Sequence, residues 1–463
     1  MKFYNRKQEL KALNDWWREK KSHLVILYGK RRVGKTALSL EFAKGKPSIF
    51  YLAERLDSKL QLEKISKEVG NFFKDEYVSQ YGFTQWEQFF KYIADKNERM
   101  VIIIDEFPYL VDSDPAIPSI FQKGWNLHLS KSKTFLILCG SSIGMMEKHT
   151  LIHGAPLYGR RSGQILVRPF NFSDLEELFP DSSFDERLMI FSTVGGTITY
   201  LKNFLSKENF WNVVENKILS KEQFLYEEVE FLLREELREP RNYFSILLAL
   251  SLGKRKTSEI INYTGFDKAT VSSYLSILQQ LLIVEKEIPV TEKFPEKSRK
   301  GLYKISDNFF EFWFRYVFRN KKLIEEGNSK EVIGIIKGSQ NEFISSNYEE
   351  VSREWVKHNI KTNFQYVGRW WDKNDEIDLV GIDSETKEII FGECKWSNKK
   401  VGTNIFIELE GKAQKVEWNN GQREENFILF SKSGFTADMI KLAKERGNVV
   451  LVDKNKLVKL NMI

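Results

Sequence analysis

Three short apolar runs mark the first third of the chain, and none of them alternates with polar residues. They cover residues 24–28, 101–104 and 135–140. Runs of this length, rich in aliphatic and β-branched residues, predict strands that are buried on both faces, as in a parallel sheet. Residues 37–43 then show the apolar spacing of a helix. We therefore expect residues 1–170 to form an α/β domain around a parallel sheet.

The pattern changes to helical spacing after residue 170. Apolar residues recur at three- and four-residue intervals in 174–178, 191–204 and 224–237. Gly195 and Gly196 punctuate the second of these segments. We expect residues 171–240 to form a helical lid that follows the sheet domain.

A different unit is predicted for residues 241–325. Three helix-like segments precede two strand-like ones, and these are residues 243–250, 257–261, 269–278, 283–288 and 301–305. Three helices followed by a hairpin predict a winged helix-turn-helix. Residues 307–319 carry aromatic side chains on several faces of one predicted helix, so we expect this helix to be a buried connector.

The last predicted unit, residues 326–463, is again α/β. A polar run at 325–330 marks its start. A helix is expected across 343–355, and strands are expected at 375–380 and 389–396 with a hairpin-like turn between them. The chain as a whole is therefore predicted to be a multidomain α/β protein.

Composition excludes several classes of protein. The chain has 463 residues, a net charge of +7 and two cysteines, Cys139 and Cys394, which lie far apart. This spacing implies neither a disulfide framework nor a zinc site. The sequence contains no apolar run long enough for a membrane span, and its first residues lack the apolar core of a signal peptide. We expect a cytoplasmic protein without membrane contact.

The first candidate site lies between the first apolar run and the helix after it. Residues 29–36 follow the pattern G-x-x-x-x-G-K-T of a phosphate-binding loop. Glycines let backbone N–H groups turn toward phosphates, Lys35 supplies a cation, and Thr36 offers a hydroxyl to Mg²⁺. The pattern predicts ATP and Mg²⁺ as cofactors, bound by Gly29, Lys30, Arg31, Arg32, Val33, Gly34, Lys35 and Thr36.

Two carboxylates follow the second apolar run, at the edge where parallel sheets bind ligands. Asp105 is predicted to hold Mg²⁺ through water, and Glu106 is placed to orient or deprotonate the attacking water. Ser141, after the third run, could sense the γ-phosphate or could simply end a strand.

Further residues near this site are open to two interpretations. Arg160 and Arg161 could supply an arginine finger, in cis or from a neighbouring subunit of a homo-oligomer, or could form an ordinary solvated or salt-bridged pair. Residues 1–20 are predicted to be a helix that could flank the nucleobase or only pack against the sheet.

The winged-helix segment is the candidate DNA-binding surface. Residues 241–304 carry 11 Lys/Arg against 6 Asp/Glu. The side chains that could face a groove or contact phosphates are Lys268, Thr270, Ser272, Ser273, Lys293, Lys297, Arg299 and Lys300. The alternative is a winged helix that serves only for packing.

A second constellation of charged residues lies in the C-terminal unit. Asp378 lies on one predicted strand, and Glu393 and Lys395 share one face of the next because side chains alternate along a strand. With Glu349 from the preceding helix, the acids could hold Mg²⁺, and Lys395 could position water or steady phosphate charge. The alternatives are a surface strand with salt bridges or a degenerate site.

These motifs, in this order, resemble the archaeal-type ATPase family of STAND/AAA+-related P-loop proteins. The resemblance rests on 29–36, 101–106, 157–161, the glycine pair, the winged helix, 376–378 and 392–396. It implies a C-terminal domain related to PD-(D/E)XK nucleases, which have a restriction-endonuclease-like fold, with Glu349, Asp378, Glu393 and Lys395 as nuclease-like positions. Ile198 departs from the family, which often has proline there, and this departure puts a nucleotide relay in doubt.

Together these features predict a slowly hydrolysing ATP switch. The switch is expected to act through the winged helix on a metal-dependent nuclease-like domain that works on DNA. Two alternatives stay open: a nucleotide-gated DNA-binding regulator whose C-terminal domain only binds, and a signalling ATPase that assembles with protein partners.

Overall fold

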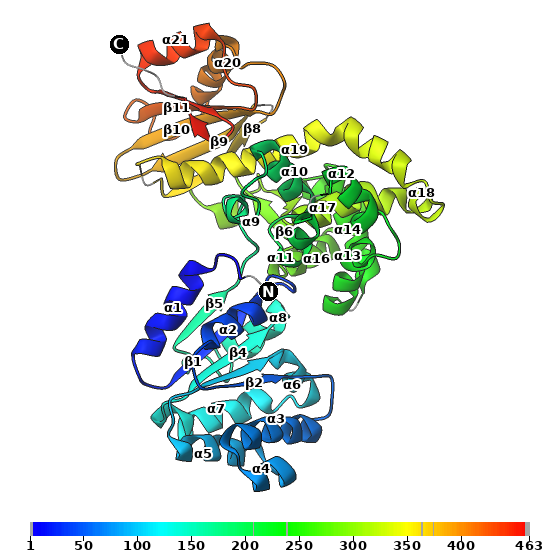
Figure 1. Cartoon of the computed structure of the whole chain (residues 1–463). Coiled ribbons are helices and arrows are strands. Elements are labelled where there is room, and N and C mark those ends of the chain that lie inside the picture. Colours follow the sequence, from blue (N-terminus) through cyan, green and yellow to red (C-terminus); the bar gives the residue numbers. More distant parts are fainter. Residues whose placement is uncertain (1–2, 207, 238, 363, 374, 459–463) are drawn as a thin grey trace. The chain divides into compact units, whose positions relative to one another are not determined.

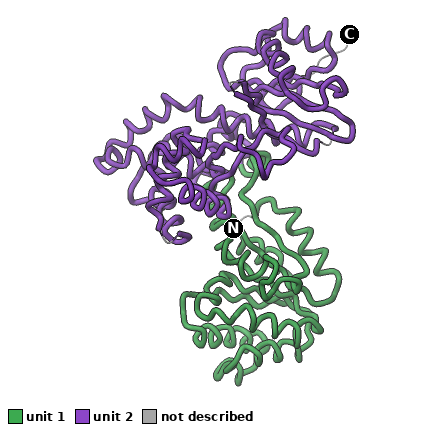
Figure 2. Tube along the Cα trace, turned by 180° about the vertical axis from the view of Figure 1, so that it is seen from behind, with its two compact units in different colours: residues 1–178, 196–202 green, residues 179–195, 203–463 purple. Residues whose placement is uncertain are grey.

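The computed structural model describes residues 3–206, 208–237, 239–362, 364–373 and 375–458. The chain forms two compact units, shown in different colours in Figure 2. Unit 1 consists of Met1–Leu178 and Gly196–Lys202, and unit 2 of Phe179–Gly195 and Asn203–Ile463. The chain therefore passes from one unit to the other after residues 178, 195 and 202. The finer division into four domains stays a prediction.

Unit 1 is built on a five-stranded parallel sheet (Figure 1). The strands are β1 (His23–Tyr28), β2 (Ser48–Leu52), β3 (Val101–Asp105), β4 (Phe135–Gly140) and β5 (Gly163–Leu166), in the order β2-β3-β4-β1-β5. Every residue of β1, β3 and β4 is buried. This burial confirms the strands that the three apolar runs predict, and it means that both faces of the sheet are covered.

Two helices cover one face of this sheet. Leu13 of α1 (Lys7–Arg18) and Phe42 of α2 (Lys35–Ala43) pack against alternate residues of β1, β3 and β4. The other helices of unit 1 are α3 (Ser58–Phe73), α4 (Glu76–Tyr81), α5 (Trp86–Lys96), α6 (Phe107–Ser113), α7 (Ile117–Leu127), α8 (Ile143–Met146), α9 (Leu175–Leu178) and α11 (Ile198–Leu201).

The helix predicted for 191–204 is interrupted in the structure. α10 (Phe184–Val194) ends at Gly195, which has a φ of 61°, and the short α11 begins at Ile198. A Cβ atom on Gly196 would lie 1.8 Å from the carbonyl oxygen of Phe170. The backbone N–H of Phe170 donates to the carbonyl of Gly196 at 2.8 Å. The helix thus ends at the glycine pair because the positive φ of Gly195 disfavours a side chain and the close backbone of Phe170 leaves no room for one on Gly196.

The middle of unit 2 has the predicted order of helices and strands. α14 (Pro240–Ser251), α15 (Thr257–Thr264) and α16 (Lys268–Gln280) precede an antiparallel hairpin of β6 (Val284–Glu287) and β7 (Leu302–Ile305). Asp267 caps α16 by accepting from the backbone N–H of Thr270. Three helices and a hairpin are the arrangement of a winged helix. We call the segment from β6 through β7, residues 284–305, the wing.

The aromatic connector is buried, as its sequence predicts, but it is not one regular helix. α17 (Asn308–Phe312) continues into a π-helical turn over Trp313–Val317, a 3₁₀ turn over Phe318–Asn320 and α18 (Lys321–Glu325). The indole N–H of Trp313 donates to the carbonyl of Tyr226 at 2.7 Å, which ties the connector to α13 (Phe224–Glu236). Another short helix of unit 2 is α12 (Phe210–Val213).

The C-terminal part of unit 2 is a six-stranded mixed sheet in the order β13-β12-β11-β10-β9-β8. β8 to β10 run antiparallel, and β10 to β12 run parallel. Phe406 and Met439 pack on one face of the sheet, and Tyr348 and Trp355 of the long α19 contact Phe430 on the other. The bounds are α19 (Ser329–Asn359), β8 (Tyr366–Asp372), β9 (Asp375–Asp383), β10 (Glu388–Lys395), α20 (Thr403–Ala413), β11 (Glu424–Ser431), α21 (Ala437–Arg446), β12 (Val449–Asp453) and β13 (Lys456–Leu457).

This sheet confirms the expected α/β character of the C-terminal region, whereas its identity as a nuclease fold stays a prediction. Across the part of the chain that the structure describes, no helix combines the length and apolar character needed to cross a membrane.

Candidate functional site

The loop between β1 and α2 closes around the side chain of Lys35. Its Nζ donates to the carbonyl oxygens of Gly29 and Lys30, at 2.9 and 2.8 Å. Gly29 has a φ of 147°, and a Cβ atom there would lie 2.3 Å from the carbonyl oxygen of Val167. Only glycine fits this position without displacing the chain beside the loop.

Lys35 is a buried cation, with 5% of its surface exposed. Burial, the largest influence, lowers the pKa of Lys35, and the nearby charges of Glu106 and Asp105 only partly oppose this effect. Among the residues that the structure describes, no carboxylate lies within ion-pairing distance of its ammonium group. Buried charges are normally paired, so this arrangement suits an external anion.

Thr36 and Asp105 meet at the mouth of the loop. The Thr36 hydroxyl donates to Oδ2 of Asp105 at 2.5 Å. Asp105 is 2% exposed, and burial raises its pKa although this hydrogen bond opposes the rise. A hydroxyl and a carboxylate oxygen are hard ligands of the kind that Mg²⁺ takes, so these two residues fit the predicted ion.

Glu106 and Ser141 also come together. Oε2 of Glu106 accepts from the hydroxyl of Ser141 at 2.8 Å and from its backbone N–H at 3.3 Å. The contact arises because β4, which precedes Ser141, pairs directly with β3 in the sheet. Glu106 has a φ of 52°, an uncommon left-handed conformation for a residue with a side chain.

The paired arginines lie on the segment before β5. Arg160 donates to the carbonyl of Tyr158 and Arg161 to that of Thr150, each at 3.0 Å. Burial raises the pKa of Tyr28, the last residue of β1, and the charge of Arg161 partly offsets that rise. The backbone N–H of Ser162, the next residue, donates to the carbonyl of Leu24 at 2.7 Å, so the backbone of Arg161 lies beside the start of β1, whereas the phosphate-binding loop follows the end of that strand. Within the described residues, neither guanidinium bonds to Lys35, Asp105 or Glu106.

The remaining loop residues are held by contacts with other segments. Arg31 donates to the hydroxyl of Tyr109 at 3.4 Å. The carbonyl of Arg32, which has a φ of 67°, accepts from the Thr199 hydroxyl of α11 at 3.2 Å. The side chain of Ile198, also in α11, lies beside Gly34. The position that departs from the family pattern is thus in contact with the loop.

Arg6 is a residue of this site that sequence analysis missed. Arg6 is 6% exposed, and its guanidinium donates to the carbonyls of Val33 at 2.9 Å and Arg168 at 2.7 Å. It also lies 4.4 Å from the ring centre of Phe170 and pairs with Glu9 at 3.0 Å. No sequence pattern predicts that Arg6 is buried in this site, because its partners lie in distant segments of the chain.

Beside Arg6 lies a cavity of about 620 Å³. Asn5, Gln164, Arg168 and Asp174 are among its lining residues, so it lies between the start of α1 and the end of β5. This location favours the hypothesis that the N-terminal segment flanks a nucleobase.

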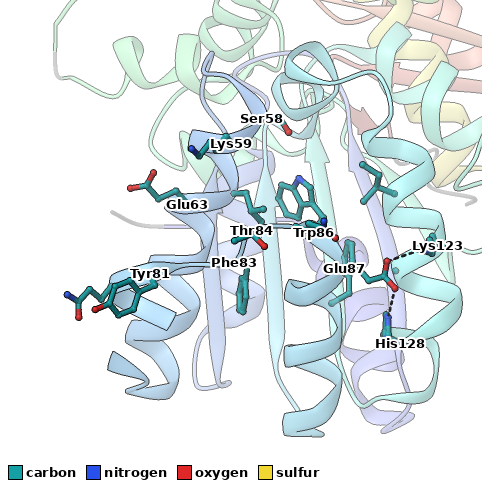
Figure 3. A pocket seen from close by; sticks show the side chains of 16 residues that line it. Ser58, Lys59, Glu63, Tyr81, Phe83, Thr84, Trp86, Glu87, Lys123 and His128 are labelled. Carbon is teal, nitrogen blue, oxygen red and sulfur yellow. Dashed lines mark hydrogen bonds and ion pairs between the residues drawn. The ribbon is translucent and has the colours of Figure 1, made fainter. Parts of the chain in front are cut away.

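A second cavity, of about 640 Å³, lies among the outer helices α3, α4, α5 and α7 (Figure 3). Trp86 and Phe90 are among its walls, and Glu87 pairs with Lys123 at 2.7 Å on its rim. No site residue predicted from the sequence is among the described residues that line it.

The C-terminal residues are gathered on two adjacent strands, as predicted. Nζ of Lys395 lies 2.7 Å from Oε1 of Glu393, which confirms that the two share one face of β10. On β9, Oδ2 of Asp378 accepts from the backbone N–H of Cys394 at 2.9 Å. Lys412 of α20 approaches the other oxygen of Glu393 at 3.5 Å.

Glu349 of α19 is near these acids but is engaged elsewhere. Burial raises the pKa of Asp378 to about 7, with further contributions from the charges of Glu349 and Glu393. Oε2 of Glu349 lies 3.7 Å from Arg353 and 3.8 Å from Arg369. In the described part of the chain, no three acidic, histidine or cysteine side chains are grouped so that they could hold a metal ion. The three acids in this arrangement therefore do not fit the predicted ion.

Three family models match separate parts of the chain. Residues 3–204 match the ATPase domain predominantly from Archaea. Residues 244–286 match the bacterial regulatory proteins of the arsR family, a helix-turn-helix model that here covers α14 through β6. Residues 313–405 match a family of archaeal and bacterial proteins of unknown function, and this range includes all four C-terminal site residues.

Similar proteins extend these matches to almost the whole chain. The uncharacterized protein MJECL04 of Methanocaldococcus jannaschii is 36% identical over 403 residues, which are 86% of this chain and 88% of the relative. The uncharacterized ATP-binding protein MJ0423 of the same organism is 54% identical over 44 residues, 10% of this chain and 75% of the relative.

A solved structure supports the fold. The Walker-type ATPase PABY2304 of Pyrococcus abyssi has a TM-score of 0.53 and 22% identity, and the match covers 68% of this chain and 96% of that one. With the extent of identity to MJECL04 and the match over residues 3–204, the chain belongs to the archaeal-type ATPase family and carries an ArsR-type helix-turn-helix after its ATPase domain.

Proposed function

We propose that unit 1 binds and slowly hydrolyses ATP, and that the bound nucleotide controls DNA binding by the winged helix. The observation that supports ATP binding is the buried side chain of Lys35. Its ammonium group lies inside the glycine-containing loop, and no carboxylate of the described residues lies within ion-pairing distance of it. The phosphate oxygens of a bound triphosphate would supply the missing negative charge beside this ammonium group. They would also accept hydrogen bonds from the backbone N–H groups at the start of α2.

Each residue around Lys35 has a separate task in this proposal. Thr36 and Asp105 would hold Mg²⁺, which when bound neutralises phosphate charge. The cavity beside Arg6 would take the nucleoside, with Asn5 and Asp174 as hydrogen-bonding groups on its wall. Arg6 would act as a support, since its donors are already used by the carbonyls of Val33 and Arg168.

Hydrolysis would depend on Glu106. Its carboxylate would accept the proton of the water that attacks the γ-phosphorus, and the Ser141 hydrogen bond at 2.8 Å would fix its orientation. Arg160 and Arg161 remain candidates for the arginine finger, in cis or from another subunit of a homo-oligomer. A finger would require their present bonds to the carbonyls of Tyr158 and Thr150 to be exchanged for phosphate contacts.

Binding of ATP is tested with Lys35→Ala. Loss of the cation should abolish binding of a fluorescent ATP analogue, while Lys44→Ala, a change of an exposed lysine just after α2, should leave it unchanged. Normal binding by Lys35→Ala would contradict the assignment of the loop.

DNA binding is supported by the ArsR-type match and by the exposed face of α16. Lys268, Ser272 and Ser273 are exposed on this helix, and Lys293, Lys297 and Arg299 are exposed near the tip of the wing. Lys300, by contrast, is paired with Glu292 at 3.2 Å and Asp372 at 3.4 Å. We therefore favour α16 and the three exposed cations as the DNA surface, without Lys300.

A gel-shift titration tests the DNA surface. Lys268→Glu should weaken binding to duplex DNA by about tenfold and reduce its salt dependence, because a phosphate contact is lost. Glu208→Lys, at an exposed position outside the winged helix, serves as a charge-changing control. Equal affinity of Lys268→Glu and the wild type would exclude Lys268 from the DNA surface, and the absence of any salt-dependent shift would favour the alternative of a signalling ATPase with protein partners.

A second candidate function is phosphodiester cleavage by the C-terminal centre. The observation that favours it is the pair Glu393 and Lys395 on β10 beside Asp378 on β9. Lys395 would stabilise negative charge on the phosphate. Cleavage of plasmid DNA with Mg²⁺ or Mn²⁺ that is lost in Lys395→Ala would support this function. Equal cleavage by both proteins would contradict it, and the absence of cleavage would favour a domain that only binds DNA.

A further inference from the structure

The middle of the wing, residues 291–299, presents an aromatic ring among cations, and we call this segment the tip. Phe294 is 64% exposed, and Lys293, Lys297 and Arg299 around it are exposed as well. Nζ of Lys297 lies 5.8 Å from the centre of the Phe294 ring. Contact of a phenyl ring with water is unfavourable, and aromatic rings interleaved with cations are typical of surfaces that bind unpaired nucleic acid bases.

The local sequence fixes the position of Phe294 in the tip. Pro295 follows it and begins a 3₁₀ turn over Pro295–Lys297. A proline disfavours the helical conformation of the residue before it, and Phe294 has a φ of −128° and a ψ of 76°. The backbone N–H of Lys297 closes the turn by donating to the carbonyl of Phe294 at 3.1 Å. A side chain on such an ordered backbone loses less freedom when it binds a ligand.

Both ends of the tip are attached to the C-terminal sheet. On one side, the backbone N–H of Val290 donates to the carbonyl of Arg369 in β8 at 3.0 Å, and the Val290 side chain packs against the core of that sheet. On the other side, the carbonyl of Lys300 accepts from the indole N–H of Trp371 at 3.2 Å. The tip is therefore held in place at both ends by the same strand, β8.

A cavity of about 490 Å³ lies beside the tip. Phe294 and Lys297 line it from the tip, and Trp370 of β8 and Lys415, just after α20, line it from the C-terminal sheet. This volume is within the range of about 300–1,000 Å³ that is usual for small-molecule pockets. Aromatic and cationic walls suit a flat ring that carries a phosphate group.

The acids near the cavity do not cancel the charge of the tip. Glu292 and Asp372 are among the lining residues, and both pair with Lys300, at 3.2 and 3.4 Å. Among the residues that the structure describes, no carboxylate forms an ion pair with the other three cations of this segment, Lys293, Lys297 and Arg299. These three positive charges are available for the phosphates of a nucleic acid.

We propose that the tip and the cavity beside it bind an unpaired DNA base, which stacks on Phe294 while Lys293, Lys297 and Arg299 contact the adjacent phosphates. This inference rests on DNA binding by the winged helix and names the DNA structure that it prefers, a duplex with one base outside the stack. A base that is already unpaired enters the site without the free-energy cost of unstacking. Because every base has a flat face, the site has little sequence preference.

The base site is tested by fluorescence anisotropy of the full chain with two labelled duplexes of the same sequence, one fully paired and one with a single unpaired adenine. The wild type should bind the bulged duplex at least about tenfold more tightly. Phe294→Ala should reduce this preference to less than twofold and leave the affinity for the paired duplex nearly unchanged. A duplex with an abasic nucleotide in the bulge has no base to stack, so the wild type should bind it like the paired duplex.

Matched variants separate stacking from a general loss of apolar surface. Phe294→Tyr keeps the ring and should keep the preference, whereas Phe294→Leu keeps an apolar side chain without a flat ring and should lose most of it. Phe231→Ala removes another exposed phenylalanine, 48% exposed on α13, and should leave the preference unchanged. Circular dichroism of each variant establishes that it is folded.

The outcomes separate the base site from the function on which it rests. A wild-type preference below twofold, a preference that Phe294→Ala leaves at its wild-type value, or an equal preference for the abasic bulge overturns the base site. If the wild type still binds the paired duplex with a salt-dependent affinity, DNA binding by the winged helix stands without this site. If the wild type binds none of the duplexes, both the base site and DNA binding are overturned.

Discussion

At the scale of single residues, the phosphate-binding loop is the part of the molecule that the sequence predicts best. The motif requires Lys35 and Thr36 to be adjacent, and the apolar run before Asp105 places that acid at the end of a buried strand. The structure joins Thr36 and Asp105 by a hydrogen bond. Local spacing is sufficient here because each side chain sits at the end of one strand or the start of one helix.

Arg6 illustrates why other site residues could not be predicted. Its acceptors, the carbonyls of Val33 and Arg168, lie 27 and 162 residues away in the sequence. Every residue has a backbone carbonyl group, so the residue types at positions 33 and 168 do not indicate that they accept hydrogen bonds from Arg6. A single buried arginine before a helix has no pattern that distinguishes it from a surface arginine.

Glu106→Gln tests the assigned base. The amide can keep the hydrogen bond from Ser141 but cannot take a proton, so kcat should fall by about 10²–10⁴-fold while ATP affinity changes little. Single-turnover hydrolysis and equilibrium binding measure the two effects. Glu87→Gln, which changes an acid on the outer helices, is the matched control. A kcat within twofold of the wild type would remove Glu106 from the mechanism.

Gly29→Ala tests the geometry of the loop. The added Cβ would meet the carbonyl oxygen of Val167 at 2.3 Å in a backbone conformation that favours glycine. We expect a loss of stability of roughly 1–3 kcal/mol and weaker ATP binding. Gly45→Ala is the control, since Gly45 has a φ of 71° but no atom within 4 Å of the added carbon. Thermal unfolding should show a smaller loss for the control, and equal losses would contradict the predicted clash.

At the scale of elements, strands and helices were predictable but their contacts were not. The winged helix follows from apolar spacing, and the predicted strand pair appears as β6 and β7. The ion pair between Glu287 of the wing and Arg369 of β8 could not be predicted from residue spacing, because the two residues lie in different segments. The break predicted at the glycine pair within 191–204 is confirmed, because α10 ends at Gly195, where φ is positive.

The wing contact predicts a specific pH dependence. Burial alone would raise the pKa of Glu287, but the charges of Lys304, Arg255, Arg369 and Arg353 outweigh burial and lower it to about 2. A carboxyl whose folded pKa is below its ordinary value of 4.5 stabilises the fold above that value. The contribution is lost as the pH falls from about 4.5 toward 2.

Glu287→Gln should therefore destabilise the chain at neutral pH by about 2–4 kcal/mol, and the difference from the wild type should shrink below pH about 4.5. Calorimetric unfolding at several pH values measures it. Glu285→Gln, on the same strand but with a side chain 48% exposed, should cost less than about 1 kcal/mol at any pH. A pH-independent difference for Glu287→Gln would contradict the role of its charge.

At the scale of the whole molecule, the proposed coupling between ATP binding and DNA binding can be measured in two ways, through the affinity for DNA and through the affinity for ATP. If ATP changes the Kd for DNA by some factor, DNA must change the Kd for ATP by the same factor. We expect a factor of about 5–150 in the wild type. Fluorescence anisotropy with labelled DNA and with labelled ATP gives both values.

Lys35→Ala provides the control for this coupling, since it should bind DNA with an affinity that ATP no longer changes. A wild-type DNA affinity that ATP leaves unchanged within twofold would show that the ATPase unit and the winged helix act independently.

The path of the chain between the two units has a consequence for how such a protein can evolve or be dissected. Ile198 and Thr199 touch the phosphate-binding loop, yet they lie in a short stretch of unit 1 flanked on both sides by residues of unit 2. A gene fragment that stops at residue 178 lacks α11, and one that runs to residue 202 takes α10 away from its neighbours in unit 2. A single crossover point in this region therefore moves a segment of one unit along with the other.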